Sequence, residues 1–167
     1  METIDPNELE SLKKLIGSLN SRPRLSVEEK DLKFKKYFKA VSSGMIEHST
    51  TYGDESGGPG MAPYSTDQKV FKAGVKSIDN NLREQIRIVA EGVEHYFQNG
   101  EYPPPYYAWR IAVILRKSKL LTLELEFLEA FNAKFCDGVG HRYGQIGERI
   151  AKLRNLIWQR HHIIAPP

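Results

Sequence analysis

Among the five histidines of this chain, His141, His161 and His162 lie towards the end of the sequence and, with one cysteine, are the candidate metal ligands. His161 and His162 are adjacent, so on a helix their side chains point in different directions, and neither they nor His141 belong to a second ligand pair of suitable spacing. Cys136 is the only cysteine, so it cannot form an intramolecular disulfide, and we expect an inert residue near a helix end. We therefore predict neither a metal site nor a cofactor. The single cysteine also suits a reducing compartment, which favours the cytoplasm.

Three glutamates are the candidate catalytic side chains. A catalytic site built from side chains alone needs a nucleophile beside a base, or two positioned carboxylates. Glu124, Glu126 and Glu129 lie on one predicted helix with lysine and arginine nearby, and the last two are three residues apart and therefore neighbours. We interpret this run as a solvated acidic face. Because no catalytic motif is visible, we predict that the chain is not an enzyme.

The elements that must position these residues are predicted to be helices, so the fold class is all-α. Apolar residues recur at spacings of three and four, and no alternating apolar run is bounded by hairpin turns. The predicted helices span 6–19, 27–41, 67–78, 82–98, 104–118, 121–135 and 141–160. A single helix over 67–98 is the alternative to a break at Asp79-Asn80-Asn81.

The predicted organisation has three parts: an N-terminal helical arm over 1–44, a flexible glycine-rich loop over 45–64 and a helical domain over 65–167. Residues 54–60 carry too little apolar surface to offset the entropy of ordering. The acidic start of the chain is not a secretory signal, and no apolar run approaches the length of a membrane span. A net charge of +3 permits a nucleic acid or an acidic partner without requiring either.

A weak internal repeat links two of the predicted helices. Residues 82–89 are answered by 121–128, which is 39 residues later and within the range of helical solenoids. The matched positions are Leu82, Gln85, Ile86, Ile88 and Val89 with Leu121, Glu124, Leu125, Phe127 and Leu128. This repeat favours the break between 67–78 and 82–98, because it produces two consecutive helix pairs.

The segment 104–119, followed by Glu124-Leu125-Glu126-Phe127-Leu128-Glu129, resembles a tetratricopeptide-type helix pair. It has a proline-led first helix, a large residue beside a small one at Ile111-Ala112, a basic turn and an acidic–apolar second helix. The resemblance covers 82–160 and is most specific over 104–131, although the repeat of 39 residues differs from the usual length of about 34. It implies antiparallel helix hairpins in a short stacked array with a concave protein-binding face. The N-terminal helices and the last helix would cap this array.

Leu120 and Leu123 are the residues that most strongly suggest a covered surface. They lie off the predicted core stripe of the helix 121–135, so a dimer seam, another protein or the N-terminal arm would each account for them. Tyr102 and Tyr106 flank the prolines and are further surface candidates, because tyrosine is enriched at interface hot spots. We therefore predict a cytoplasmic, non-catalytic adaptor that binds another protein or itself, with no membrane partner.

The alternative is a nucleic-acid-associated protein that uses the basic helices 27–41 and 141–160. Lysine and arginine side chains that neutralise phosphates give strong, salt-sensitive binding. The candidate phosphate ligands are Lys33, Lys36, Arg149, Lys152 and Arg160.

Overall fold

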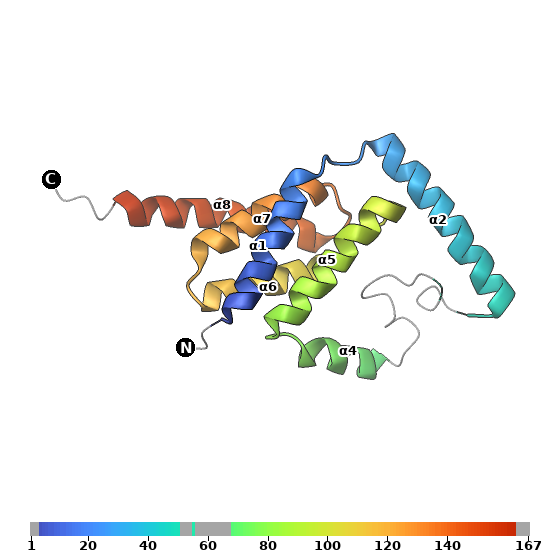
Figure 1. The fold of residues 1–167 in the computed structure, drawn as a ribbon, viewed down its shortest axis with the longest axis horizontal. Helices are drawn as coiled ribbons and strands as arrows, with labels where there is room; N and C mark the ends of the chain where they lie inside the picture. Colours follow the sequence, from blue (N-terminus) through green and yellow to red (C-terminus); the bar gives the residue numbers. More distant parts are fainter. Residues whose placement is uncertain (1–3, 51–54, 56–67, 163–167) are drawn as a thin grey trace. The chain divides into compact units, whose positions relative to one another are not determined.

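The computed structural model describes residues 4–50, 55 and 68–162, and within these ranges every regular element is a helix (Figure 1). The helices are α1 (Pro6–Ser21), α2 (Val27–His48), α4 (Gln68–Ser77), α5 (Leu82–Asn99), α6 (Pro105–Lys117), α7 (Leu121–Phe135) and α8 (His141–His162). The prediction of an all-α fold is confirmed. None of the helices described is both long enough and apolar enough to cross a membrane.

The chain divides into two compact units, and the division differs from the one predicted. Residues Met1–Arg22 and Pro105–Pro167 form the first unit, and Pro23–Pro104 form the second. The predicted arm over 1–44 is therefore split, because α1 belongs with α6, α7 and α8 whereas α2 belongs with α4 and α5. Within the predicted loop, 45–48 are helical, and most of the remainder lies outside the described residues.

α7 lies at the centre of the first unit, because α1, α6 and α8 each pack against it. Its aromatic side chains Phe127, Phe131 and Phe135 are fully buried and stand four residues apart, so they share one side of the helix. The ring centroids of Phe131 and Phe135 are 4.7 Å apart. The Tyr143 ring of α8 stacks nearly parallel to Phe131 at 6.5 Å. These rings form the core of the unit.

α1 docks on α7, as an N-terminal arm would. Asp5 caps the helix by accepting a hydrogen bond from the Asn7 backbone N–H at 2.9 Å, and Pro6 occupies the first turn, where no backbone donor is needed. The buried residues of α1 are Leu12, Leu15, Ile16 and Leu19. Four such side chains contribute roughly 6–12 kcal/mol of gross hydrophobic free energy, so we regard α1 as an integral part of this unit.

In the second unit, α4 and α5 are separate helices, as the favoured alternative predicted. Asn81 caps α5, and its side-chain oxygen accepts from the Glu84 backbone N–H at 3.1 Å. At the other end, Gly100 ends the helix with φ of 73°, a left-handed conformation that costs glycine little. The buried residues of α5 are Leu82, Gln85, Ile86, Ile88, Val89, Gly92, Val93 and Tyr96.

α2 begins as predicted but does not end as predicted. The Ser26 side chain accepts from the Glu29 backbone N–H at 3.1 Å, which is the expected cap. The helix then continues through 42–44 and ends at His48, followed by Ser49 with φ of 54°. A glycine inside a helix costs only about 1 kcal/mol relative to alanine, so this short serine–glycine sequence is too weak to stop it.

Candidate functional site

The most concentrated polar chemistry in the first unit surrounds Glu124, whose side chain is 0% exposed. Arg116 Nε donates to one carboxylate oxygen at 2.9 Å, and Arg149 Nε donates to the other at 2.6 Å. α6, α7 and α8 each contribute one member of this network. Both oxygens accept from guanidinium groups, and the carboxylate itself is not exposed to solvent, whereas the Arg116 and Arg149 side chains are 40% and 14% exposed.

Arg149 makes two further contacts besides its bond to Glu124. Its Nη2 donates to the Ala112 carbonyl oxygen at 3.0 Å, and its guanidinium lies 4.7 Å from the centroid of the Trp109 ring. The Arg142 guanidinium lies 5.0 Å from the same ring centroid. Charge-assisted hydrogen bonds and cation–π contacts of this kind hold α6, α7 and α8 together.

The interpretation of the three glutamates as one solvated face is wrong for Glu124 and fits the other two. Glu126 is exposed, and Glu129 forms an ion pair at the surface with Arg154 at 2.6 Å. The fourth position of α7 faces the interior because Leu121 and Leu128 on the same side are buried. The two arginines supply the compensation that a buried carboxylate needs.

Burial follows the 39-residue spacing of the sequence repeat. Gln85 and Glu124 occupy matching positions and are the two polar side chains in the described ranges that are fully buried. Each bonds to the end of the preceding segment, with opposite roles: Gln85 Nε2 donates to the Ile78 carbonyl at 2.7 Å, whereas the Glu124 carboxylate accepts from Arg116. Gln85 and Glu124 each interrupt an apolar stripe at the same position of the repeat. This shared position was the sequence signal that could have predicted the burial of both side chains.

The same spacing relates α6 to α8, which sequence reasoning missed. Arg149 lies 39 residues after Arg110. Three of the six buried positions of α6 also correspond at this offset to buried positions of α8. These are Tyr107, Ile111 and Ile114 in α6 and Ile146, Ile150 and Leu153 in α8.

A second polar cluster, in the second unit, surrounds His95. Its Nε2 is 2.9 Å from Glu101 Oε2, and its Nδ1 is 3.1 Å from the Asn99 side-chain amide. With both ring nitrogens hydrogen-bonded, His95 offers no nitrogen to a substrate or a metal ion. Among the residues that the structure describes, no three His, Cys, Asp or Glu side chains gather as metal ligands.

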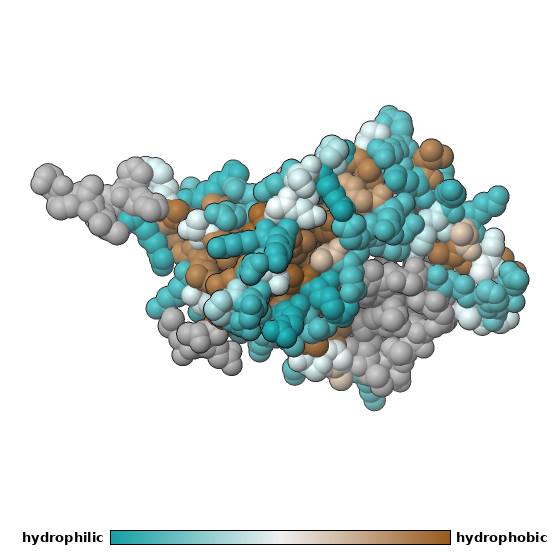
Figure 2. All heavy atoms as spheres, viewed as in Figure 1, coloured by the Kyte–Doolittle hydropathy of each residue, from teal (hydrophilic) through white to brown (hydrophobic). Residues whose placement is uncertain are grey.

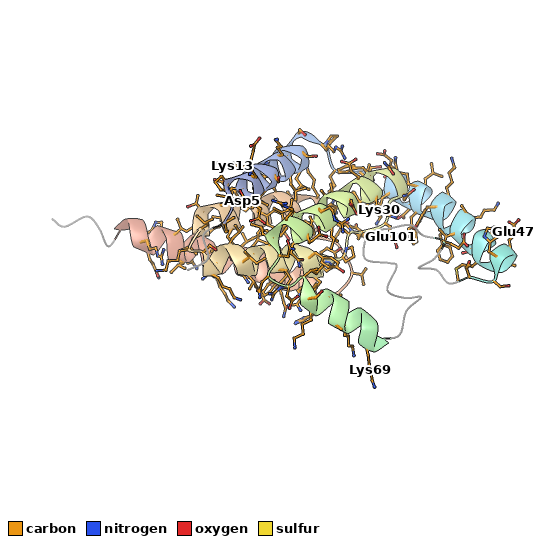
Figure 3. All side chains as sticks on the ribbon, turned by 60° about the horizontal axis from the view of Figure 1, so that its bottom comes forward. Asp5, Lys13, Lys30, Glu47, Lys69 and Glu101 are labelled. Atoms are coloured by element: carbon orange, nitrogen blue, oxygen red, sulfur yellow. The ribbon has the colours of Figure 1, made fainter. Side chains whose placement is uncertain are left out.

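This cluster belongs to the contact between α2 and α5. Lys33 Nζ donates to the Phe97 carbonyl at 2.9 Å, which satisfies an end group of α5. Lys30 Nζ lies over the Tyr102 ring at 5.1 Å from its centroid. Figure 3 labels Lys30 and Glu101 in the region where α2 and α5 meet. A Cβ at Gly100 would overlap the Lys30 carbonyl oxygen, so the two backbones approach closely.

α2 also exposes large apolar side chains to solvent, beside its contact with α5 and further round the helix. We call these residues the α2 apolar face: Val27, Leu32, Phe34, Phe38 and Ile46, which are 61%, 71%, 38%, 49% and 84% exposed. Only two other large apolar side chains in the described ranges are comparably exposed, Val139 and Trp158. Figure 2 shows hydrophobic residues at the surface of α2 among hydrophilic ones. An apolar cluster of this kind on one helix is typical of an interaction site.

The residues predicted to bind a partner are not on this face. Leu120 and Leu123 are half-buried at the start of α7. Tyr106 is half-buried on α6, where its ring contacts Tyr107 edge-on at 5.5 Å. Tyr102 packs against Tyr96 at 5.3 Å. Tyr102 belongs to the second unit and the other three belong to the first.

Two of the five predicted phosphate ligands are used within the fold. Lys33 is bonded to the end of α5, and Arg149 is bonded to Glu124 and Ala112, so neither is available as proposed. Lys36, Lys152 and Arg160 are exposed. The charge pattern in the sequence could not distinguish these two groups, because their difference lies in contacts between helices.

The chain has no match among the protein-family models, the curated proteins and the solved structures with which it was compared.

Proposed function

We propose that this chain is a non-catalytic protein-interaction module that binds a helix of its partner through the α2 apolar face. The single observation that carries this proposal is the exposure of five large apolar side chains on one helix. The sequence predicted partner binding by Leu120, Leu123, Tyr102 and Tyr106, whereas this proposal assigns it to α2.

The spacing of the exposed residues supports a helical partner. Val27, Phe34 and Phe38 are separated by seven and four residues, which places them along one side of the helix. Side chains in this arrangement form a ridge that packs into the groove of another helix. Val41 continues the same line and is already buried. The exposed row of Val27, Phe34 and Phe38 is therefore continuous with a part of α2 that packs within the chain.

The energy available from this surface indicates a moderate or weak complex. Completing the burial of each side chain contributes roughly 1–2 kcal/mol, because each is already partly covered. Five of them contribute roughly 5–10 kcal/mol, which is comparable to the cost of about 4–15 kcal/mol for association. Polar contacts must therefore help to set the affinity and the choice of partner.

The two polar networks support a role without catalysis. Glu124 is enclosed by guanidinium groups, and His95 has both ring nitrogens bonded, so each stabilises the fold. We also propose a tetratricopeptide-like arrangement for α6, α7 and α8, supported by the common 39-residue spacing. A cytoplasmic location is part of the proposal, on the basis of the single, exposed Cys136.

The proposal is tested by affinity capture from the native host with two baits, the unmodified chain and Phe38→Asp. The matched control is Lys36→Asp, which changes an exposed residue of the same helix outside the α2 apolar face. We expect the unmodified and control baits to retain the same proteins, including copies of the chain itself, and Phe38→Asp to lose them. Identical capture by all three baits would reject the proposed surface.

A further inference from the structure

Charged residues beside the α2 apolar face are divided by sign along the helix. Glu28 and Asp31 lie in its first turns, and Lys35 and Lys39 lie further along. Their spacings of three, four and four residues place all of them on the same side of the helix. This side therefore has an acidic part followed by a basic part, next to exposed Val27 and Phe38.

Most of these charges are exposed and have no ion-pair partner among the residues that the structure describes. Glu28, Lys35 and Lys39 are exposed and form no ion pair in the part of the chain that the structure describes. The Asp31 side chain is 54% exposed, and its carboxylate lies 3.5 Å from Lys30 Nζ. Charged side chains left exposed around an apolar seam are available to select a partner.

We infer that the occupant of the α2 apolar face from Val27 to Phe38 is the α2 helix of a second copy of this chain, packed antiparallel. This inference rests on the proposed function and names the partner. A two-fold axis near residue 33 places Asp31 of each copy beside Lys35 of the other and Glu28 beside Lys39. The same axis places Val27 of each copy beside Phe38 of the other. The interface is isologous, because every contact occurs twice.

The direction of pairing follows from the charges. An antiparallel pair gives four attractive contacts between copies, whereas a parallel pair in register places acidic residues beside acidic ones and lysines beside lysines. Like charges in close contact are destabilising. α2 is thus complementary to itself in the antiparallel orientation and not in a parallel pair in register.

Reciprocal charge reversal in the full-length chain tests this pairing. One variant is Glu28→Lys/Asp31→Lys, and the other is Lys35→Glu/Lys39→Glu. The mass of each, alone and mixed, is measured by sedimentation equilibrium against the chain mass of 19.1 kDa. The matched control is Lys13→Glu/Lys36→Glu, which makes the same charge change as the second variant at exposed residues outside this side of α2.

We expect the unmodified chain and the control to dimerise, and each reversed variant alone to dimerise about tenfold more weakly or worse. Mixing the two variants should restore a dimer, because opposite charges then face each other. This rescue also shows that both variants are folded. A monomer at all concentrations, or a dimer unaffected by the reversals, would overturn the inference. In either case the proposed function would still be decided by the comparison of capture with and without Phe38→Asp.

Discussion

Replacing Glu124 by glutamine tests the role assigned to the buried network of the first unit. The substitution keeps the size of the side chain and removes its charge. A glutamine amide accepts through one oxygen, so its NH₂ group would be directed at the second guanidinium. Arg116 or Arg149 would then lose its acceptor.

The expected loss of stability follows from the exposure of the partners. The Arg149 side chain is only 14% exposed and the Glu124 side chain is 0% exposed. Removing one partner of a buried ion pair costs about 3–5 kcal/mol, because the remaining charge is uncompensated. Since Arg149 retains its bond to the Ala112 carbonyl and the Arg116 side chain is 40% exposed to solvent, we expect the lower end, about 3 kcal/mol.

Denaturant unfolding followed by Trp109 fluorescence measures this loss, because Trp109 lies against Arg149. The exposed Trp158 is replaced by phenylalanine in every variant to remove its signal. The control is Glu129→Gln, which breaks an exposed pair with Arg154 and should cost under about 1 kcal/mol. Equal, small losses for the two glutamine variants would refute the structural role of Glu124.

Three further predictions concern other parts of the chain. Gly100→Ala should destabilise the second unit by about 1–3 kcal/mol, because the positive φ disfavours alanine and its Cβ would overlap the Lys30 carbonyl. Amide hydrogen exchange along α2 should then become faster. An unchanged exchange rate would contradict the close approach of the two backbones. Burial raises the pKa of Tyr107, so stability should fall as pH rises above the ordinary tyrosine value of about 10. A Tyr107→Phe variant measured over the same alkaline range should lose that part of the decline, and an identical decline would count against it. Binding to unrelated DNA duplexes should be weak at physiological salt; tight binding with a steep salt dependence, reduced by Lys36→Glu, would instead favour the nucleic-acid alternative.

The helices could be predicted from the sequence because their signals are local. Apolar spacing and side-chain caps depend on neighbouring residues, and Asn81 separates α4 from α5 through a bond to the Glu84 backbone three residues on. The end of α2 was predicted too early, at 41, because the short serine–glycine sequence after it is a weak stop. Helix ends are decided by small energies, so they are the part most easily misplaced.

The candidate surface could not be predicted in the same way. The apolar stripe of α2 is visible in the sequence, but its exposure depends on which helices pack around it. Leu120 and Leu123 were expected to be covered by a second copy, another protein or the N-terminal arm; both are half-buried, and local sequence does not say which of these covers them. Similarly, nothing local distinguishes Arg149, which binds a buried carboxylate, from the exposed Lys152. Contacts between helices decide these outcomes, and they follow from packing rather than from local sequence pattern.

Hydroxyl-radical footprinting of Phe34 and Phe38 is the most direct test of the α2 apolar face as a binding surface. The extent of oxidation is measured in the dilute isolated chain, in the concentrated chain and in an extract of the native host. We expect oxidation of both rings in the dilute chain and protection of both in at least one of the other two samples, with exposed Val139 oxidised equally in all three. Equal oxidation of Phe34 and Phe38 under every condition would contradict this expectation.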